Sequence, residues 1–253
     1  KFTSIRELVL LDHKRDANIY FTANAHYANE YFKYKAAGKK NSKYLIMQHG
    51  GGYGLFKLNH GESWEVGVAD KFYSFGWSNK KNIKYLAPSK FIHIPKKIKK
   101  NNDILYVTNT ISRYLRNFNG YGFFGDSAEK LFINQRINFL DTVNNNINIK
   151  IRMYPTDPYK LYEKQRIEDM LYPNIVFDDY KQDFLKSLLS CKLHITDVTM
   201  TTFLEALIYN IPTVCFSPAL EHNLSNISQD LVYELVRVKI LFYDAKKAAE
   251  IGR

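Results

Sequence analysis

The sequence has very few cysteines and no long apolar segment. Its two cysteines, Cys191 and Cys215, both lie in apolar surroundings. Two cysteines so far apart suit neither a disulfide framework nor a zinc site, so we expect a reducing compartment. No apolar run approaches the roughly 20 residues of a membrane-spanning helix, and the N-terminus shows no signal-peptide pattern. Because residue 1 is Lys and not Met, we expect a fragment of a longer protein.

Several familiar site signatures are also missing. The chain has no Walker A sequence, no HExxH and no Asp-x-Asp pair of the kind that metal-dependent sugar-nucleotide enzymes use. We therefore expect a metal-independent mechanism with no bound cofactor. Gly120–Gly125 matches the dinucleotide fingerprint, but a long loop separates it from the preceding strand. The fingerprint also requires an acidic residue at the end of the next strand, whereas Asp141 lies in a predicted helix. We interpret this stretch as an aromatic glycine loop that could line an acceptor cleft.

Composition indicates a folded, basic protein. The 253 residues are 45% hydrophobic and 15% aromatic, which excludes disorder and fits one large or two modest domains. The net charge of +11 suggests an anionic partner: a nucleotide, a phosphorylated substrate, nucleic acid or an acidic membrane surface. Lysines concentrate at 87–102, which we interpret as a basic linker between domains at 1–86 and 103–253. No nucleic-acid-binding motif appears, so we expect no nucleic-acid partner.

Apolar runs alternate with amphipathic segments along the chain. Helices are expected at 25–37, 126–143, 159–171, 180–191 and 202–209, and strands at 18–22, 43–47, 103–107, 148–153, 174–177, 192–196 and 213–216. A helix followed by a strand is expected between Glu62 and Trp77. This alternation predicts an α/β fold with parallel, doubly wound sheets. In such sheets ligands bind at the carboxyl ends of the strands.

A glycine-rich stretch, Gln48–Gly54, directly follows one predicted strand. Its four glycines let the backbone approach a ligand and adopt positive φ. The adjacent His49 has an unperturbed pKa of about 6.5, which suits proton transfer near neutrality. The simpler interpretation is a glycine-rich turn with an incidental histidine. The carboxylates that follow, Glu62, Glu65 and Asp70, are catalytic candidates, although a solvated charged face also explains them.

Arginines follow two of the predicted strands in the second half. Arg152 stands at a strand end, where its guanidinium could hold a phosphate in a bidentate manner. The structural alternative is an ion pair with Asp157. Arg113 and Arg116 follow an earlier strand and could contact phosphate or acceptor, although a solvated loop also accounts for them.

A threonine-rich segment precedes one predicted helix. Thr199, Thr201 and Thr202 lead into it, and a helix N-terminus with its unpaired N–H groups favours phosphate. The structural alternative is a capping box formed by Thr202 and Glu205. Capping and binding are compatible, because Thr199 and Thr201 lie outside that pair.

Four motifs together carry a family resemblance: Gln48–Gly54, Arg152–Asp157, Thr201–Ala206 and Asn210–Thr213. In this order they resemble the transferase family found in bacterial O-antigen and surface-polysaccharide gene clusters. The His-Gly loop and the Thr-Asp segment are more distantly similar to CDP-glycerol glycerophosphotransferases and Kdo transferases. The resemblance covers most of 43–250. It implies a GT-B-like fold, with two Rossmann-like domains facing a cleft, the N-terminal one incomplete here.

The resemblance implies a glycosyltransferase of surface polysaccharide biosynthesis. A sugar would move from a nucleotide-activated donor, with a CMP-sugar as the candidate, to a glycan acceptor. His49 would be the general base or an electrostatic stabiliser, and Glu65 or Asp70 an alternative base or nucleophile. The residues implied to bind substrate are Gly50, Gly51, Gly52, Tyr53, Arg152, Thr199, Thr201, Thr202 and Glu205. Among these, Arg152, Thr201 and Thr202 would hold the donor phosphate and Glu205 the ribose.

One departure and two alternatives bear on this expectation. Related phosphotransferases often carry His-Pro where this chain has Tyr154 and Pro155, which puts a second catalytic histidine in doubt. The alternatives are a CDP-alditol-type glycerophosphotransferase and a non-catalytic module that binds glycan or anions. The expected partners are the nucleotide-sugar co-substrate and a glycan or lipid-linked glycan acceptor. We expect a cytoplasmic protein that could touch the acidic inner-membrane surface peripherally.

Overall fold

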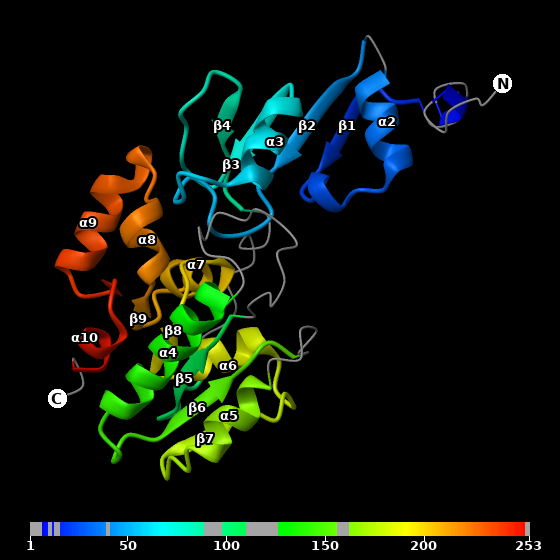
Figure 1. Ribbon diagram of the computed structural model, residues 1–253. Helices are drawn as coiled ribbons and strands as arrows, with labels where there is room; N and C mark the ends of the chain where they lie inside the picture. The colour runs from blue at the N-terminus through cyan, green and yellow to red at the C-terminus, as the bar shows by residue number, and fades with distance from the viewer. Residues whose placement is uncertain are drawn as a thin grey trace. The chain divides into compact units, whose positions relative to one another are not determined.

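The computed structural model describes residues 7–9, 12, 16–38, 41–88, 98–109, 126–155 and 162–250. The chain divides into two compact units, which we call unit 1 and unit 2 (Figure 1). Unit 1 comprises Lys1–Tyr53 and Asn59–Ile92, and unit 2 comprises Gly54–Leu58 and His93–Arg253. The return of the short segment Gly54–Leu58 to unit 2 was not predicted from the sequence. The glycine loop at 120–125, Asp157, Arg113 and Arg116 lie outside the described residues.

Unit 1 is built on a four-stranded parallel sheet with the order β1-β2-β3-β4. The strands are β1 Ile19–Thr22, β2 Lys43–Met47, β3 Lys71–Ser74 and β4 Ile83–Tyr85. The helical elements are η2 Ala25–Tyr27, α2 Glu30–Gly38 and α3 His60–Val68. Its core joins the apolar side chains of Ile46 and Phe72 on the strands to Val66 on α3.

The helix expected at 25–37 is wrong in its first half. The chain forms the short η2, then an extended residue at Ala28, and α2 begins only at Glu30. Asn29 is the physical cause: its side-chain oxygen accepts the backbone N–H of Phe32 at 2.8 Å. An asparagine in this position satisfies an otherwise unpaired N–H and starts a helix there.

Unit 2 is built on a six-stranded parallel sheet with the order β10-β9-β8-β5-β6-β7. The strands are β5 Ile104–Val107, β6 Ile149–Arg152, β7 Ile175–Phe177, β8 Leu193–Thr196, β9 Thr213–Phe216 and β10 Leu241–Phe242. The first strand of this unit in sequence order, β5, pairs with both β6 and β8, so the winding direction reverses there. The predicted α/β class with parallel sheets is confirmed.

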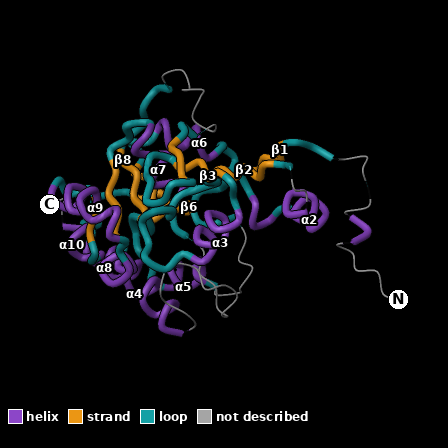
Figure 2. The backbone as a smooth tube through the Cα atoms, turned by 90° about the horizontal axis from the view of Figure 1, so that it is seen from above, coloured by secondary structure: helices purple, strands orange, loops and turns teal. Residues whose placement is uncertain are grey.

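Helices cover both faces of this sheet, as Figure 1 allows the reader to follow. Tyr106 of β5 packs with Phe139 on one face, whereas Leu105 packs with Leu188 on the other. The helices are α4 Asp126–Thr142, α5 Glu163–Asp169, α6 Phe184–Ser190, α7 Thr201–Ile208, α8 Pro218–Asn223, η4 Asn226–Ser228, α9 Gln229–Arg237 and α10 Ala245–Ala249. In Figure 2, α8, α9 and α10 gather near the C-terminus.

The helix expected at 180–191 starts later than predicted. Tyr180 adopts a left-handed φ of 59°, and α6 begins at Phe184. Asp183 sets this start, because its side chain accepts the backbone N–H groups of Leu185 and Lys186. None of the helices in the described ranges combines the length and apolar character that a membrane crossing requires.

The segment Gly54–Leu58 is anchored by backbone pairing within unit 2. The Lys57 N–H donates to the Asn223 carbonyl at 2.8 Å, and the Ser225 N–H donates to the Leu55 carbonyl at 2.8 Å. Leu55 and Phe56 are buried in a core cluster with α7, α8 and α9. The glycine loop therefore continues directly into a strand-like segment whose backbone is hydrogen-bonded to Asn223 and Ser225.

Candidate functional site

A hydrogen-bonded cluster of His49, Tyr53 and Glu65 lies at the carboxyl end of β2; we call it the histidine cluster. His49 Nδ1 and the Tyr53 hydroxyl oxygen are 2.7 Å apart, and the same hydroxyl donates to Glu65 Oε2 at 2.7 Å. The His49 side chain is 38% exposed, whereas the Glu65 side chain is 0% exposed. The cluster thus connects a buried carboxylate to an imidazole that solvent and substrate can reach.

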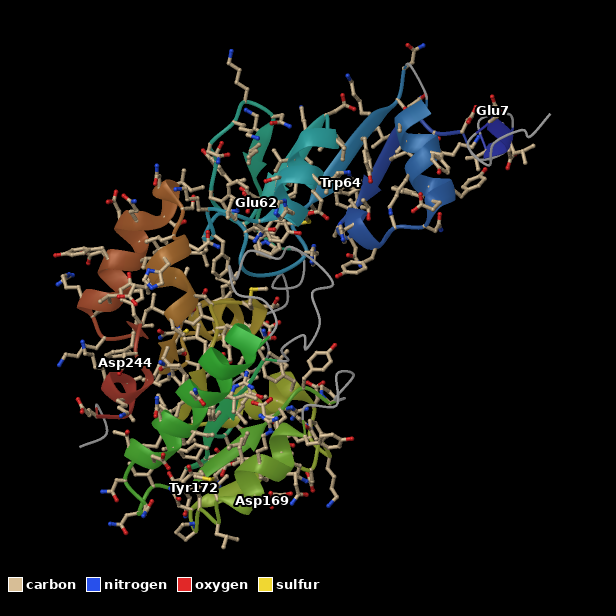
Figure 3. The ribbon with its side chains drawn as sticks, in the orientation of Figure 1. Glu7, Glu62, Trp64, Asp169, Tyr172 and Asp244 are labelled. Carbon is tan, nitrogen blue, oxygen red and sulfur yellow. The ribbon has the colours of Figure 1, made fainter. Side chains whose placement is uncertain are left out.

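The local sequence of α3 explains why Glu65 faces inward. Asn59 caps the helix by accepting the Glu62 N–H at 3.1 Å, which fixes the first turn. Glu65 and Val66 then lie on the buried side, while Glu62 and Trp64 stand outside it (Figure 3). The backbone N–H of His26 donates to Glu65 Oε1 at 3.3 Å. Both carboxylate oxygens therefore accept a hydrogen bond, as a buried carboxylate requires.

The Tyr53 phenol is held in its protonated form. Burial raises its pKa far above the usual value, and the negative charge of Glu65 and its hydrogen bond add to this effect. The ring stacks on Phe72, with centroids 6.0 Å apart and an interplanar angle of 20°. Tyr53 was expected to contact substrate, but the structure places it beneath His49 and buries it.

Gln48 holds the glycine loop in shape. Its buried side-chain amide donates from Nε2 to the Gly50 carbonyl at 2.7 Å. Its Oε1 accepts the Phe75 N–H at 3.0 Å and the Trp77 Nε1–H at 2.9 Å. These three bonds fix the backbone on either side of His49. This role was not predicted from the sequence, because it depends on contacts with Phe75 and Trp77 that only the fold creates.

The loop glycines permit the turn that inserts Tyr53 into the core. Gly52 and Gly54 have φ values of 85° and 73°, which side chains with a Cβ rarely adopt. The three glycines Gly50, Gly51 and Gly52 are buried. Their expected role in presenting amide groups to developing charge stays a prediction.

Aromatic rings border His49 on its exposed side. Tyr27 is 70% exposed, and its ring centroid lies 6.5 Å from that of His49 in an edge-to-face arrangement. The His26 ring contacts Tyr27 and Trp64 in the same manner, at 5.2 and 5.9 Å. Tyr27 was not predicted from the sequence, because nothing in its local pattern ties it to the glycine loop.

The structure separates Asp70 from the histidine cluster. Asp70 immediately precedes β3, and its Oδ2 accepts the Tyr44 backbone N–H at 2.7 Å. This is the amino edge of the parallel sheet, whereas His49 follows β2 at the carboxyl edge. The expectation that Asp70 acts as base or nucleophile therefore finds no support in its position.

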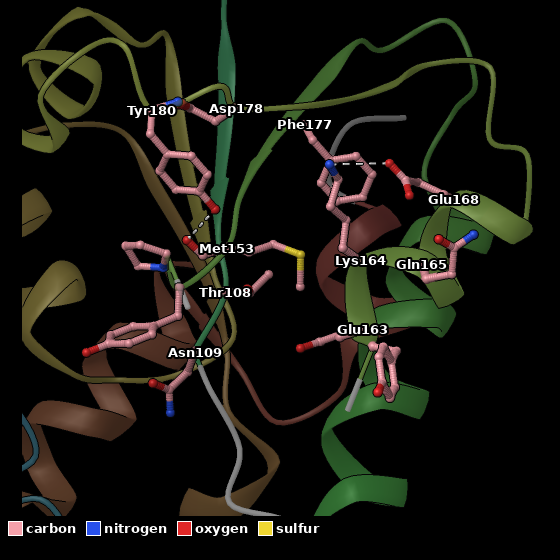
Figure 4. Close-up of a pocket in the computed structure, with 13 residues that line it drawn as sticks. Thr108, Asn109, Met153, Glu163, Lys164, Gln165, Glu168, Phe177, Asp178 and Tyr180 are labelled. Atoms are coloured by element: carbon pink, nitrogen blue, oxygen red, sulfur yellow. Dashed lines mark hydrogen bonds and ion pairs between the residues drawn. The ribbon is translucent and has the colours of Figure 1, made fainter. Parts of the chain in front are cut away.

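Unit 2 contains a pocket of about 480 Å³ at the carboxyl ends of β5, β6 and β7 (Figure 4). Its walls are aromatic and acidic side chains together with the start of α5. The lining residues are Thr108, Asn109, Met153, Tyr154, Pro155, Tyr162, Glu163, Lys164, Gln165, Glu168, Phe177, Asp178 and Tyr180. This is the edge at which open α/β sheets bind ligands.

Two features indicate that this pocket is built for a ligand. The Thr108 hydroxyl is buried and has no hydrogen-bond partner among the described atoms. An unsatisfied buried hydroxyl is uncommon in folded proteins, and a ligand at the pocket wall would supply its partner. Tyr162 and Tyr180 have φ values of 52° and 59°, a strained conformation that clusters at functional sites.

A buried ion-pair network includes two residues that line the pocket, Asn109 and Glu163. Arg136 on α4 is 1% exposed, and its guanidinium pairs with Asp197 after β8 and with Glu163 at the start of α5. It also donates to the Asn109 carbonyl at 2.6 Å, and the Asn109 N–H donates to Asp197 Oδ1 at 3.1 Å. The network therefore ties three strand and helix ends together.

Arg152, the expected phosphate ligand, is engaged within the protein. Its Nη1 lies within 3.3 Å of Asp178 Oδ2, 3.0 Å of the Gln182 carbonyl and 3.2 Å of Ser187 Oγ. The Tyr180 ring lies 5.3 Å from its guanidinium carbon. Asp178 is thus a partner that the sequence did not reveal, and these contacts argue against a bidentate phosphate at Arg152.

The other expected donor ligands lie at the β8 to α7 connection. Helix α7 begins at Thr201 with Met200 as its N-cap and no side-chain cap bond, so the capping box of Thr202 and Glu205 is wrong. Glu205 is buried. The Thr199 hydroxyl is buried and has no partner among the described atoms. None of these residues is among the described residues that line the pocket.

Within the described ranges, no group of three or more His, Cys, Asp or Glu side chains is arranged to hold a metal ion. Metal independence stays a prediction.

Unit 1 holds a cluster of an imidazole and a carboxylate, and unit 2 holds a pocket at its strand ends. In an α/β protein with parallel sheets, this combination fits the class of group-transfer enzymes. The chain belongs to the LIC12162 transferase family, whose model it matches over residues 1–251. No curated protein matches it.

The solved structures to which the chain is similar at low identity include the following two. One is the wall teichoic acid polymerase TagF soaked with CDPG: 12% identity, 88% of this chain and 60% of that chain covered, TM-score 0.41. The other is a mutant of S. aureus TarM in complex with Fondaparinux, alpha-GlcNAc-glycerol and UDP: 15% identity, 71% and 38% covered, TM-score 0.43. The chain thus spans less than two thirds of either protein.

Proposed function

We propose that this transferase is a glycosyltransferase that moves a sugar from a nucleotide-activated donor, of the CMP-sugar class, to a surface-glycan acceptor. The observation that carries the proposal is the histidine cluster of unit 1. An exposed imidazole linked through a phenol to a buried carboxylate is an arrangement suited to general base catalysis. The resemblance of the surrounding motifs to transferases of surface-polysaccharide gene clusters supports the same reaction class.

The proposed reaction is a displacement at the anomeric carbon of the donor sugar. His49 Nε2 takes the proton of an acceptor hydroxyl, and that oxygen forms the new bond to the anomeric carbon. The bond from the anomeric carbon to the donor phosphate oxygen breaks, and the nucleotide leaves with the electron pair. The imidazolium that forms lies 4.0 Å from Glu65, whose negative charge stabilises it.

The pocket in unit 2 is proposed as the site of the donor nucleoside. The rings of Tyr154, Tyr162 and Tyr180 offer faces for a base, and carboxylates in the wall can accept hydrogen bonds from ribose hydroxyls. Thr108 would gain its missing partner. A phosphate is less suited to this acidic wall, so the proposed phosphate position is the N-terminus of α7, where Thr201 and Thr202 were expected to hold it. The Thr199 hydroxyl, which has no partner among the described atoms, lies in the connection just before this helix.

The acceptor is proposed to approach His49 past Tyr27 and Trp64. Both rings are exposed: the Tyr27 ring borders the His49 imidazole, and the Trp64 ring contacts His26, whose own ring contacts Tyr27. Sugar rings present apolar C–H faces that pack on aromatic surfaces. This position would bring an acceptor hydroxyl to the exposed side of His49.

The test is turnover with CMP-sugars and UDP-sugars, followed as nucleotide release. We expect His49→Ala to lower kcat by at least about 100-fold, because general base catalysis contributes about 10²- to 10⁴-fold. His222→Ala is the matched control, since His222 is an exposed histidine of unit 2 that pairs with a neighbouring glutamate on α8. Equal turnover in wild type and His49→Ala would remove His49 from the mechanism.

A second candidate rests on the likeness of the His-Gly loop to CDP-glycerol glycerophosphotransferases. The same base would then direct an acceptor hydroxyl at phosphorus, and an alditol phosphate would move from a CDP-alditol. Both reactions can release CMP, so the product decides: a phosphodiester supports this candidate and a glycosidic bond the first. Binding of glycan without turnover on any donor would favour a non-catalytic module.

A further inference from the structure

The hydroxyl of Tyr53 is the only described link through which Glu65 and His49 are hydrogen-bonded. The phenol oxygen lies 2.7 Å from His49 Nδ1 and 2.7 Å from Glu65 Oε2. The direct separation of His49 Nδ1 from Glu65 Oε1 is 4.0 Å, which is too long for a hydrogen bond. Any effect of Glu65 on the orientation of the imidazole must therefore pass through the phenol.

The donors and acceptors along this link determine which atom carries each proton. Glu65 accepts the His26 N–H on Oε1, so it receives the Tyr53 proton on Oε2, as a carboxylate does. The phenol has one proton and gives it to Glu65. Its oxygen can then only accept from His49, which requires the proton of the neutral imidazole to sit on Nδ1. Nε2 is left with its lone pair.

We propose that Tyr53 is the positioning residue that selects the Nδ1–H tautomer of His49 and connects its imidazole to the Glu65 carboxylate. The inference deepens the proposed function, in which His49 is the base, and rests on it for its catalytic meaning. The phenol supplies no proton to the reaction. It keeps Nε2 as the acceptor of the substrate proton and passes the stabilising influence of Glu65 to the imidazolium.

The backbone of the loop is shaped for this role. Gly52 and Gly54 flank Tyr53 with left-handed φ values of 85° and 73°, and this turn directs the ring inward. There it stacks on Phe72, 6.0 Å between centroids, which fixes the hydroxyl against α3. The phenol stays protonated because burial and the charge of Glu65 raise the pKa of Tyr53 far above its usual value.

The first measurement is the tautomer of His49, read from the ¹⁵N chemical shifts of its ring nitrogens in the labelled 253-residue chain above neutral pH. Wild type should show Nδ1–H. Tyr53→Phe removes the acceptor and should shift His49 toward the Nε2–H form. Tyr44→Phe is the matched control: it deletes a buried hydroxyl in the same core that has no partner among the described atoms, and it should change nothing.

Glu65→Gln provides a second, independent variant. The His26 N–H should hold the amide oxygen, so the amide N–H₂ faces Tyr53 and donates to the phenol oxygen. The phenol proton then turns to His49 Nδ1, and the tautomer reverses to Nε2–H although Tyr53 is still present. This variant keeps the shape of the side chain, so it reports on the proposal even where Tyr53→Phe does not fold.

The second measurement is CMP release from a CMP-sugar. Tyr53→Phe should lower kcat by about 10- to 100-fold with KM little changed, as is typical when the partner of an orienting hydrogen bond is lost. An Nε2–H tautomer in wild type, or a tautomer that both variants leave unchanged, overturns the proposal. The expected tautomer changes with full turnover in His49→Ala would refute the proposed function and leave the positioning role intact.

Discussion

His194 illustrates at the residue scale what burial does to a polar side chain. It lies within β8, is completely buried, and neither ring nitrogen has a hydrogen-bond partner among the described atoms. Burial lowers its pKa from the usual value of 6.5 to about 3. The residue is therefore neutral in the folded protein, and nothing in the proposed reaction uses it. The lowered pKa of His194 instead affects how the stability of the fold depends on pH.

We predict that His194 destabilises the fold in mild acid. Above the unfolded pKa of 6.5 both states are neutral and the residue has no effect. Between pH 6.5 and about 3 only the unfolded chain takes up the proton, so the free energy of unfolding falls by up to about 1.4 kcal/mol per pH unit. His194→Phe should flatten this slope in urea unfolding series from pH 7 to 5. A slope equal to that of wild type contradicts the assignment.

The control for this series is His222→Gln. His222 is exposed on α8, so its environment changes little on unfolding. The slope of its variant should match that of wild type, and the difference between the two variants isolates the buried imidazole.

At the scale of elements, Arg136 joins three segments that are distant in the sequence. Its guanidinium connects α4 to Asp197 after β8, to Glu163 at the start of α5 and to the Asn109 carbonyl after β5. Helix α5 is short, and its N-cap Tyr162 makes no side-chain cap bond. The ion pair with Glu163 thus fixes a helix start that its own sequence does not.

We predict that Arg136→Met lowers the free energy of unfolding by about 3 to 5 kcal/mol. Removing one member of a buried ion network leaves the partner charges without compensation, and here two carboxylates lose their cation. Urea unfolding measures the change. Arg237→Met is the matched control, since its pair with Glu234 on α9 is exposed and should contribute below about 1 kcal/mol. Equal losses in both variants would show that the network is not stabilising.

At the scale of the whole molecule, each unit presents its candidate groups at the carboxyl edge of its own parallel sheet. Unit 1 places the histidine cluster after β2, and unit 2 places the pocket after β5, β6 and β7. A ligand of unit 2 that binds only the folded chain must raise the stability of the folded state.

We therefore predict that one of CMP, CDP, UDP and GDP raises the thermal midpoint of the chain. At a ligand concentration 100 times its Kd the stabilisation is about 2.7 kcal/mol. CMP and CDP are the expected ligands. No shift with any of the four would contradict the assignment of the pocket to a nucleoside.

A pair of threonine variants locates the nucleotide. Thr108→Val and Thr199→Val each remove a buried hydroxyl that has no partner among the described atoms, so the ligand-free proteins should be about as stable as wild type. Loss of the shift in Thr108→Val places the ligand in the pocket. Loss only in Thr199→Val would favour the α7 site that the sequence motif indicated.

The sequence singled out His49 and Glu65 as candidates, but it did not reveal the residues that surround them. His49 and Glu65 were candidates because a glycine loop follows a strand and carboxylates follow the loop. Asp70 was equally close in sequence, yet it precedes a strand and lies at the opposite edge of the sheet. Gln48, Tyr27 and the link through Tyr53 were missed, because their roles depend on contacts made across the fold.

The α/β class, the parallel sheets, the strand that ends in the glycine loop and the family motifs could all be predicted from the sequence. These follow from local periodicity and from residues that act where they stand in the chain. Only the tertiary structure decided that Arg152 pairs with Asp178 and that Arg136 unites three segments. It alone placed the pocket between the ends of β5, β6 and β7. The physical reason is that strand order and burial decide which distant side chains meet.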